Sequence, residues 1–386
     1  MTSNRFKKIK NAINYFITGV LIFIIKFKPV GKKEKTLLLI RLDAIGDYIL
    51  FRNFLESVRH SKRYGGYKIT LCGNIIWKSL AETFDKGFVE NFIWLDRKKF
   101  YNNIIYKYRL LKNIYLSGFE TAIEATHSRE ILYGDTIVNA ANAKNSIGSI
   151  GSGEEFTVWK RKMLTNKLYS QLIEISNDNL FEFEINKELF GKIVGENLTI
   201  KKPYLDTSSL KAETTNKKYI LLFPGSNDLK KMWSGENFKA VAEFLTSNYE
   251  YDIVVSGSNK EAYLFNEIII EIFHNRFYNL FGNTLPELAK LIAEAELIIS
   301  NDTSAIHFAA AVDTPFICIS NGSYFGRFHP YPKHDYEQAY YVYPPSFIEN
   351  PDKFDLLKQK YRFSSDIDIK EIKPQIVIEL IKKILK

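Results

Sequence analysis

The stretch LIISNDTSAIHFAAAVDTP, from Leu297 to Pro315, decides the fold of the chain's second half. Its first four residues, Leu297 to Ser300, form a short apolar run that predicts a buried strand. The run breaks at the polar Asn301 to Thr303, and the residues that follow, including His307, have helical spacing. A strand, a turn and a helix therefore follow one another directly. The turn lies at a helix N-terminus, where unpaired N–H groups and the helix dipole favour an anion such as a diphosphate.

The same turn has a plainer interpretation. Asp and Thr are common N-cap residues, so Asp302 or Thr303 could simply cap the following helix. The stretch by itself does not separate an anion site from a cap. The rest of the chain has to decide.

Length and composition indicate a folded protein of about two domains. The chain has 386 residues, of which 46% are hydrophobic and 15% aromatic, which is enough to bury sizeable cores. Its two cysteines, Cys72 and Cys318, lie far apart in apolar contexts. A disulfide framework or a zinc cluster is therefore not expected, and a reducing compartment fits.

The net charge of +9 is concentrated at the N-terminus. Residues 1–35 hold nine Lys and Arg against one acid, so only +1 remains for the rest of the chain. The basic residues therefore do not form a groove across the folded domains, as they would in a protein that binds nucleic acid. The charge pattern therefore argues against a nucleic-acid partner.

The basic leader, residues 1–35, contains an amphipathic helical pattern. Its apolar positions are Ile13, Phe16, Ile17, Val20, Leu21 and Ile24, and its polar positions are Asn11, Asn14 and Thr18. From Ile13 to Ile25 the run is shorter than the roughly 20 residues that span a bilayer. We therefore expect residues 1–30 to lie on an anionic membrane surface. The alternatives are a helix that docks on the protein's own surface and a signal peptide, which Lys26, Phe27 and Lys28 disfavour because they replace small cleavage-site residues.

Strands and helices alternate after the leader. The expected strands are Thr36–Arg41, Lys68–Cys72, Asn91–Leu95 and Thr121–Ala125, with a helix over Asn103–Ser117. This alternation predicts a doubly wound parallel sheet in an N-terminal domain over residues 36–206. Residues 126–206 give no clear pattern, and we expect acceptor-facing loops there.

A polar stretch at 207–218 predicts a linker, and a second alternating run predicts a C-terminal domain over residues 207–386. Its expected strands are Tyr219–Phe223, Asp252–Val255, Phe277–Phe281, Leu297–Ser300 and Phe316–Ser320. Thr284 and Glu287 form a T-x-x-E capping box. Most of these strands end in small or polar residues. Because the carboxyl ends of parallel strands share one edge, we expect the ligand site at this edge.

The loop after the first strand carries a candidate base. It has a single glycine, Gly46, so it lacks the G-x-G-x-x-G fingerprint of dinucleotide enzymes. The next residue, Asp47, stands at the mouth of a helix, where a carboxylate could take a proton from a substrate hydroxyl. Alternatively, Asp47 only complements the helix dipole.

A lysine in the second half is a candidate phosphate ligand. Lys231 follows a strand, precedes Trp233 and shares its loop with Ser226 and Asn227. An ammonium beside hydroxyl and backbone donors suits a phosphate oxygen, although an isolated lysine is most often only solvated. The chain has no P-loop, and its six histidines form no H-x-x-x-H or H-E-x-x-H pair, so no metal site is expected. Asp366 and Asp368 are interpreted as acids at a helix start.

Four segments resemble the bacterial heptosyltransferases of glycosyltransferase family 9. They are RLDAIGDYIL at 41–50, PGSNDLKKMW at 224–233, GNTLPELAKLIAEAELIISNDTSAIHFAAA at 282–311 and the DTPFICI that follows. The resemblance implies the GT-B fold, in which two Rossmann-like domains face each other across a cleft. It also implies that the final helix, residues 369–386, packs back on the N-terminal domain.

The resemblance also implies roles for particular residues. Asp47 would be the catalytic base and Lys231 the phosphate-contacting lysine. The other implied donor-binding residues are Ser226, Asn227, Asn259, Asn283, Asp302, Thr303, Ser304 and His307. Ser304 departs from the family, which usually has glycine there, and its Cβ could crowd a diphosphate close to the backbone.

The activity implied by the resemblance is an inverting, metal-independent glycosyl transfer that uses no cofactor. The expected donor is a nucleoside-diphosphate sugar, ADP-heptose being favoured, and the expected acceptor is a lipid-linked glycan such as lipopolysaccharide core. The enzyme would be cytoplasmic and peripheral on the inner face of the bacterial inner membrane. Two alternatives stay open: another GT-B enzyme, such as a nucleotide-sugar epimerase, and a catalytically silent membrane-bound protein that binds nucleotide sugars.

Overall fold

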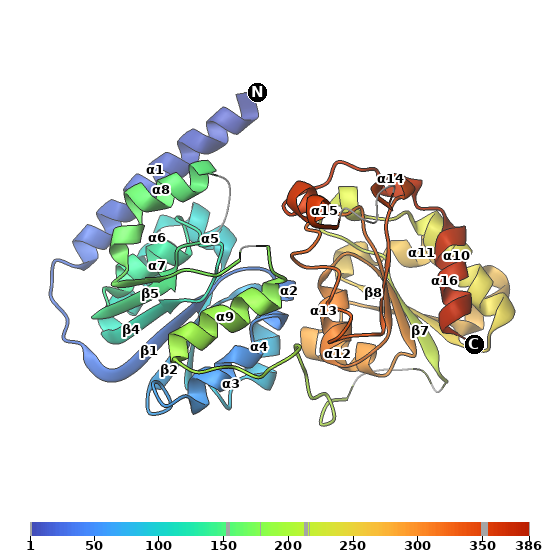
Figure 1. The fold of residues 1–386 in the computed structure, drawn as a ribbon, viewed down its shortest axis with the longest axis horizontal. Helices are drawn as coiled ribbons and strands as arrows, with labels where there is room; N and C mark the ends of the chain where they lie inside the picture. Colours follow the sequence, from blue (N-terminus) through green and yellow to red (C-terminus); the bar gives the residue numbers. More distant parts are fainter. Residues whose placement is uncertain are drawn as a thin grey trace. The chain divides into compact units, whose positions relative to one another are not determined.

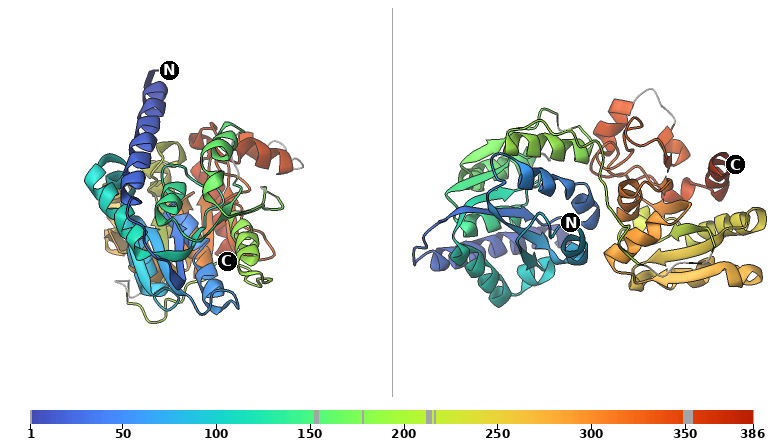
Figure 2. Two further views of the ribbon diagram at one scale, coloured as in Figure 1. Left: turned by 90° about the vertical axis from the view of Figure 1, so that its left-hand side faces the viewer. Right: turned by 90° about the horizontal axis from the view of Figure 1, so that it is seen from below.

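The chain folds into two compact units, which are described separately (Figures 1 and 2). The computed structural model describes residues 2–151, 155–177, 179–211, 215, 217–348 and 354–385. Unit 1 comprises residues 1–178 and 184–199, and unit 2 comprises residues 179–183 and 200–386. Each unit is built around one six-stranded sheet.

The sheet of unit 1 has the order β3-β2-β1-β4-β5-β6, and all its strand pairs are parallel. Its strands are β1 (Lys33–Arg41), β2 (Lys68–Asn74), β3 (Asn91–Leu95), β4 (Phe119–Glu124), β5 (Asn145–Ser149) and β6 (Gln171–Ile173). Its helices are α1 (Thr2–Ile25), α2 (Ile45–Ile49), α3 (Asn53–His60), α4 (Lys78–Phe84), α5 (Arg97–Asn102), α6 (Ile104–Ser117), α7 (Gly134–Ala141), α8 (Glu155–Leu164) and α9 (Glu182–Val194), with the 3-10 turns η1 (Ile75–Trp77) and η2 (Asn166–Leu168).

The sheet of unit 2 repeats this topology, with the order β12-β11-β10-β7-β8-β9. Its strands are β7 (Tyr219–Phe223), β8 (Asp252–Gly257), β9 (Phe277–Phe281), β10 (Leu297–Asn301), β11 (Phe316–Ile319) and β12 (Ala339–Val342). Its helices are α10 (Gly235–Asn248), α11 (Leu264–Ile268), α12 (Leu285–Ala293), α13 (Ser304–Ala311), α14 (Pro345–Ile348), α15 (Phe354–Tyr361) and α16 (Pro374–Ile384), with the 3-10 turns η3 (Leu229–Lys231), η4 (Asn259–Glu261), η5 (Glu271–Arg276) and η7 (Ile369–Glu371).

In both sheets the chain starts in the middle, builds one side and then crosses to the other. The direction reverses between β1 and β4 in unit 1 and between β7 and β10 in unit 2. Ligands of open α/β sheets bind at such switch points, outside the carboxyl ends of the strands. The predicted α/β class with two doubly wound parallel sheets is confirmed.

Local sequence signals explain why several elements form where they do. The middle of β1, from Leu37 to Ile40, is wholly buried because both faces of the sheet are covered by helices. The Thr284–Glu287 capping box is present at the start of α12, as predicted. At β9, Gly282 has a φ of +84°, and an added Cβ would collide with the Asn259 side chain, so only glycine fits there.

The helix at the N-terminus, α1, is longer than its apolar run. By length and composition, its stretch Phe6–Ile25, with a mean hydropathy of 1.4, could cross a membrane. The helix continues from Ile13 back to Thr2, so the length of the apolar run Ile13–Ile25 does not by itself exclude a span. Figures 1 and 2 show its N-terminal half extending past the rest of unit 1.

α1 docks on the rest of unit 1 through its polar side. This agrees in part with the alternative that the leader helix docks on the protein's own surface. Lys107 of α6 donates to the Asn14 side chain at 2.5 Å and to the Thr18 hydroxyl at 3.0 Å. Ile22 and Ile25 at the C-terminal end enter the core of the unit. The opposite, apolar side of the helix stays exposed.

The domain boundary differs from the predicted division at residues 206 and 207. The chain first enters unit 2 at residues 179–183 and finally at residue 200, and Leu205 N donates to Ala311 O within that unit. Of the predicted linker 207–218, residues 212–214 and 216 lie outside the described residues. The described residues of this stretch, 207–211, 215, 217 and 218, belong to unit 2.

The final helix also differs from the expectation for residues 369–386. Ile369, Ile372, Val377 and Ile381 are buried in the core of unit 2, where α16 packs against α10. The amphipathic face that was expected to pack on the N-terminal domain is thus used within unit 2. Lys386 lies outside the described residues.

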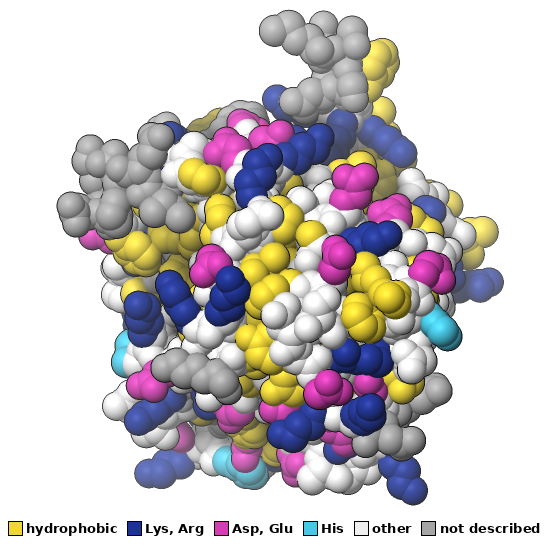
Figure 3. All heavy atoms as spheres, turned by 90° about the vertical axis from the view of Figure 1, so that its right-hand side faces the viewer, with side chains coloured by type: hydrophobic (Ala, Val, Ile, Leu, Met, Phe, Trp, Pro, Cys, Tyr) yellow, Lys and Arg dark blue, Asp and Glu magenta, His cyan; other side chains and the backbone are white. Residues whose placement is uncertain are grey.

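On the face of unit 2 in Figure 3, basic and acidic side chains are interspersed around a central apolar area. This face carries no field of one sign, which agrees with the concentration of the net charge in the leader.

Candidate donor site

The loop that carries Lys231 is held to the end of β10 by one buried amide. Asn301 donates to Pro224 O at 2.6 Å and accepts from Trp233 N at 3.1 Å. These bonds close the loop at both ends, at the switch point between β7 and β10. Trp233, itself buried, donates through its indole N–H to Ile372 O at 2.8 Å. The loop is therefore fixed before any ligand binds.

Within this loop, Lys231 forms an ion pair with Asp302. The lysine Nζ lies 2.6 Å from Asp302 Oδ2, and the side chains are only 13% and 6% exposed. Lys231 Nζ also lies 4.5 Å from the ring centre of Tyr324, a cation–π contact. The structure therefore brings together two of the predicted site residues and orients the ammonium at the switch point.

A second basic side chain near Asp302, that of His329, was not singled out from the sequence. His329 Nε2 lies 3.6 Å from Asp302 Oδ2, and its ring contacts Ser323 O at 2.8 Å and the Tyr343 hydroxyl at 2.9 Å. Burial raises the pKa of Asp302, but His329 and Lys231 outweigh burial and hold that pKa well below its usual range. Asp302 is therefore ionised. The aromatic stretch around His329 has no helical or strand periodicity, so only the fold shows its place.

The helix after the turn, α13, begins at Ser304 and is capped by Thr303. The Thr303 hydroxyl accepts from Ala305 N at 3.3 Å. The capping interpretation thus holds for Thr303, whereas Asp302 instead binds Lys231. Because Asp302 directly precedes the N-cap Thr303, the Lys231–Asp302 pair lies next to the start of α13, whose first N–H groups have no partner within the helix. A diphosphate would find both kinds of donor there.

His307 lies one turn into α13 and is buried. Its Nδ1 lies 2.8 Å from the Tyr331 hydroxyl. Burial lowers the pKa of His307 to about 4; Asp302 opposes this effect, while His329 and Lys231 add to it. The imidazole is therefore neutral at pH 7. It therefore brings no positive charge to a phosphate.

The remaining predicted donor residues lie at the ends of β7, β8 and β9. Ser226 is half-buried and accepts from Asp228 N at 3.2 Å, while Asn227 is exposed. Asn259 is exposed at the start of η4, and Asn283 donates to Leu280 O at 2.9 Å. These strands belong to the same parallel sheet as β10, with β7 directly beside it, so the residues lie along the carboxyl edge of that sheet. Among the described residues, none of these four side chains forms a hydrogen bond with Lys231 or Asp302.

In unit 1, the predicted base Asp47 lies in the first turn of α2, half-buried, at the switch point next to β1. The loop before it is rigid, because Asn74 and Trp77 both donate to Asp43 O. The residue after it, Tyr48, is buried and donates to Asp85 at 2.7 Å. The backbone on both sides of Asp47 is therefore fixed.

Unit 1 also holds a buried polar cluster that the sequence did not indicate. Glu124, at the end of β4, lies near Asp135, whose Oδ1 binds Arg129 at 3.0 Å and the Tyr169 hydroxyl at 2.5 Å. Burial, and then Asp135, raise the pKa of Glu124 to about 8, while Arg129 opposes them. The cluster lies in the region without a clear sequence pattern, where only tertiary contacts bring the charges together.

Comparison with known proteins agrees with the predicted resemblance. The model of glycosyltransferase family 9 (heptosyltransferase) matches residues 155–339. A curated lipopolysaccharide heptosyltransferase 3 of Escherichia coli is 29% identical over 151 residues, 33% of this chain and 44% of that protein. The same-named protein of Escherichia coli strain K12 is 24% identical over 225 residues, 54% of this chain and 61% of that protein. The chain thus spans about half the length of the curated relatives it matches.

Solved structures match over most of the chain. The Escherichia coli heptosyltransferase WaaC, solved with ADP-2-deoxy-2-fluoro heptose, has a TM-score of 0.67 and 14% identity, covering 90% of this chain and 99% of that one. A Veillonella parvula glycosyl transferase of family 9 has a TM-score of 0.67 and 16% identity, covering 92% and 97%. The resemblance to the family 9 heptosyltransferases is confirmed, and the fold is theirs.

Proposed function

We propose that this chain is an inverting, metal-independent glycosyltransferase that moves a heptose from ADP-heptose to a lipid-linked glycan such as lipopolysaccharide core. It would act as a peripheral protein on the cytoplasmic face of the bacterial inner membrane. The observation that carries the proposal is the fixed Lys231–Asp302 pair beside the N-terminus of α13. It occupies the switch point of a sheet whose fold matches enzymes solved with ADP and an ADP-sugar analogue.

On the donor side, the diphosphate would lie against Lys231 and the first N–H groups of α13. The ammonium and the helix dipole both stabilise the negative charge that grows on the leaving diphosphate. Asp302 holds Lys231 in place at 2.6 Å. A fixed ammonium does the electrostatic work that a metal ion does in other transferases.

On the acceptor side, Asp47 would act as general base. Its carboxylate takes the proton of an acceptor hydroxyl, and that oxygen attacks the anomeric carbon opposite the diphosphate. The bond from the anomeric carbon to the diphosphate oxygen breaks, and the configuration inverts. Asp47 suits this role because the backbone around it is anchored by Asn74, Trp77 and Tyr48.

The membrane association would come from α1. Its exposed side chains include Ile13, Phe16, Val20, Phe23 and Ile24, a continuous apolar side on a helix flanked by lysines. Apolar side chains that enter the headgroup region and lysines that meet anionic lipids together favour an interfacial helix. The helix keeps its polar contacts with unit 1 in this position.

Activity assays with labelled ADP-heptose test the proposal. With a lipid-linked acceptor, wild-type protein should release ADP and label the lipid. The Asp47→Asn variant should lose about 10² to 10⁴ in turnover while still binding donor, because only the proton transfer is removed. Near-normal turnover of this variant would overturn the assignment of the base.

The same assay separates the alternatives. An epimerase-like enzyme would release free sugar and nucleoside diphosphate without acceptor, and a silent binding protein would release neither. A thermal-shift screen across ADP-, GDP-, UDP- and CDP-sugars would identify the donor base. Replacing Ser304 by Gly, the residue usual in the family, is expected to tighten diphosphate binding.

A further inference from the structure

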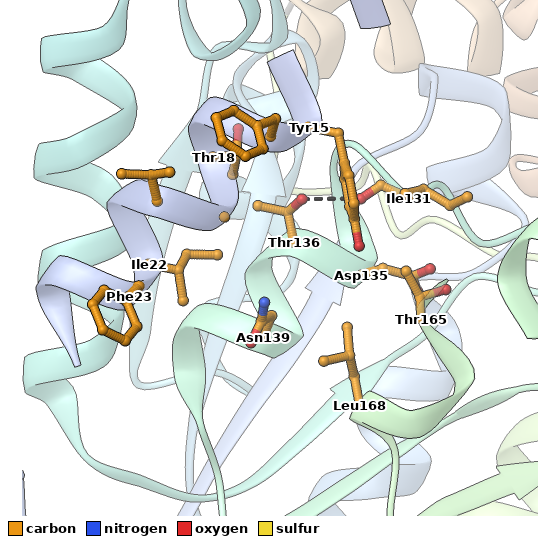
Figure 4. Close-up of a pocket in the computed structure, with 13 residues that line it drawn as sticks. Tyr15, Thr18, Ile22, Phe23, Ile131, Asp135, Thr136, Asn139, Thr165 and Leu168 are labelled. Carbon is orange, nitrogen blue, oxygen red and sulfur yellow. Dashed lines mark hydrogen bonds between the residues drawn. The ribbon is translucent and has the colours of Figure 1, made fainter. Parts of the chain in front are cut away.

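An apolar groove lies between α1 and the body of unit 1 (Figure 4). It has a volume of about 430 Å³, within the usual range for ligand pockets. Its walls come from α1, from α7 and the turn before it, and from η2. The lining residues are Tyr15, Phe16, Thr18, Gly19, Val20, Ile22, Phe23, Ile131, Asp135, Thr136, Asn139, Thr165 and Leu168.

One wall of the groove belongs to the exposed apolar side of α1. Phe16, Val20 and Phe23 line the groove and are also 72%, 43% and 75% exposed. The groove is therefore continuous with the surface proposed above to enter the membrane. A chain leaving the bilayer could enter the groove without crossing water.

Gly19 borders the groove on α1. A Cβ built at this position would meet no atom within 4 Å. A larger side chain therefore has room to enter the groove from this position.

The floor of the groove is polar and incompletely paired. Asp135 Oδ2 and Thr165 Oγ1 are buried and have no hydrogen-bond partner among the described residues. Asp135 and Thr165 themselves are 0% and 1% exposed. Asp135 uses its other oxygen for Arg129 and Tyr169, so Oδ2 is the acceptor that remains; because less than 1 Å² of it is exposed, a ligand donor reaches it when neighbouring groove side chains shift. A buried polar atom left without a partner costs about 1–3 kcal/mol, which a ligand donor would offset.

We propose that this groove binds one aliphatic chain of a membrane lipid, and that the chain carries a hydroxyl or amide donor for Asp135 Oδ2 and Thr165 Oγ1. The inference rests on the membrane association of α1 in the proposed function. The apolar walls fit the methylene chain, and the unpaired oxygens on the floor distinguish a substituted chain from a plain one. The occupant is a lipid of the surrounding bilayer, because the groove opens onto the exposed apolar side of α1.

Photo-crosslinking in vesicles tests the groove. Full-length protein is mixed with phosphatidylglycerol vesicles that contain a diazirine-labelled lipid, whose chain either carries a hydroxyl or lacks it. The hydroxylated chain should label residues 15–23 and 165–168 several-fold more than the plain chain. Equal labelling by both chains, or labelling confined to Ile13 and Ile24 on the outer side, would overturn the proposal.

Two variants and a matched control sharpen this test. Gly19→Leu fills the groove and should lower the labelling at least tenfold while vesicle sedimentation stays unchanged. Ala12→Leu, which adds the same side chain at an exposed position of α1 outside the groove, should leave the labelling unchanged. Labelling of Gly19→Leu at the wild-type level would contradict the assignment.

Thr165→Val separates a ligand role from a structural one. Because Thr165 Oγ1 has no partner in the described protein, the variant should melt at the wild-type temperature or above it. It should nevertheless lose part of the preference for the hydroxylated chain, and an unchanged preference would count against the proposal. Unlabelled acceptor glycolipid should leave the labelling unchanged, and protection by it would overturn the assignment to a bilayer lipid. Labelling needs no sugar donor, so its result is independent of the transferase assay.

Discussion

Lys231 and Asp302 form a closely coupled ion pair. Their contribution to the free energy of unfolding can be measured separately from their contribution to turnover. Lys231→Ala leaves the Asp302 carboxylate buried without its closest cation. Removing one partner of a buried pair costs about 3–5 kcal/mol, so the free energy of unfolding should fall by about that amount. Adding Asp302→Asn should restore much of the stability, but not the transfer, because the charge that stabilises the leaving diphosphate is still missing.

Urea unfolding and turnover of the two single variants and the double variant check this prediction. Lys231→Arg serves as the control, since it keeps the charge. If the stability losses of the single variants simply add in the double variant, the two side chains are not coupled.

His307 makes unit 2 sensitive to acid. Its pKa is about 4 in the folded protein, below the ordinary value of 6.5, so between these pH values the unfolded chain binds more protons. Stability is therefore lost as pH falls from about 6.5 to about 4, at up to about 1.4 kcal/mol per pH unit. The groups near the ring are Asp302, His329, Lys231 and Tyr331.

The comparison of wild type with His307→Gln isolates this effect. Glu124 acts in the opposite direction, because its raised pKa of about 8 adds stability at low pH that is lost as pH rises through about 8. The difference in unfolding free energy between wild type and variant should shrink between pH 7 and pH 5. A difference independent of pH would show that His307 does not titrate in this way.

The helix α1 turns its polar side toward the protein and its apolar side toward solvent, the reverse of an ordinary surface helix. The polar side meets the protein through Asn14 and Thr18, whereas the apolar side meets solvent. Burial of Lys107 under this helix lowers the pKa of its ammonium to about 8, although the ammonium donates to Asn14 and Thr18. The arrangement has a physical reason if the outer side is covered by lipid.

Substitutions on opposite sides of α1 should therefore have opposite effects. Ile13→Ser with Ile24→Ser changes two exposed positions outside the groove and should abolish most vesicle binding with little change in melting temperature. Ile22→Ala changes a core position and should cost about 2–5 kcal/mol of stability. Sedimentation with anionic vesicles and thermal unfolding measure the two effects.

If the double variant Ile13→Ser, Ile24→Ser still sediments with vesicles, α1 is not the membrane anchor. Deletion of residues 1–30 is a less specific test. It removes the membrane side but also takes Ile22 and Ile25 out of the core, so the truncated protein would lose solubility for a structural reason.

For the whole molecule, the path of the chain between the units matters. Residues 179–183 belong to unit 2, although α9, which they begin, otherwise belongs to unit 1. Within this segment, Glu182 is buried and its carboxylate lies 2.9 Å from Arg327 Nε. The fold of unit 2 therefore includes residues 179–183, which come before the part of α9 that belongs to unit 1.

Glu182→Gln should lower the stability of unit 2 by about 3–5 kcal/mol, because Arg327 loses its anionic partner in a buried position. Hydrogen exchange resolves the effect by region. Protection should fall around residues 320–331, while residues 186–194 of α9 keep theirs. Protection lost only in α9 would contradict the assignment of this segment to unit 2.

The strand and helix pattern could be predicted where periodicity was strong. Tyr219–Phe223, Phe277–Phe281 and Asn91–Leu95 have the bounds that their sequence predicted. β5, with the sequence NSIGS, and the three-residue β6 were not predicted, because polar and short strands leave no periodic signal. Their burial comes from neighbours in the sheet.

The site could be predicted in part. Lys231, Asp302 and Thr303 come from motifs at strand ends, and the structure brings the first two into contact. His329 and Glu124 could not be predicted, since their roles depend on partners far away in the sequence. Whether Asp302 caps the helix was also open, and the contact with Lys231 decides it.

The sequence by itself determined that the chain alternates strands and helices in two halves, that its basicity belongs to the leader, and that LIISNDTSAIHFAAAVDTP forms a strand, a turn and a helix. These are local properties, set by hydrophobic period and turn chemistry. Only the tertiary structure decided which side of α1 faces the protein, where α16 packs, and what Asp302 binds. An amphipathic pattern shows that two sides differ, but which side is buried depends on the surface that each side meets.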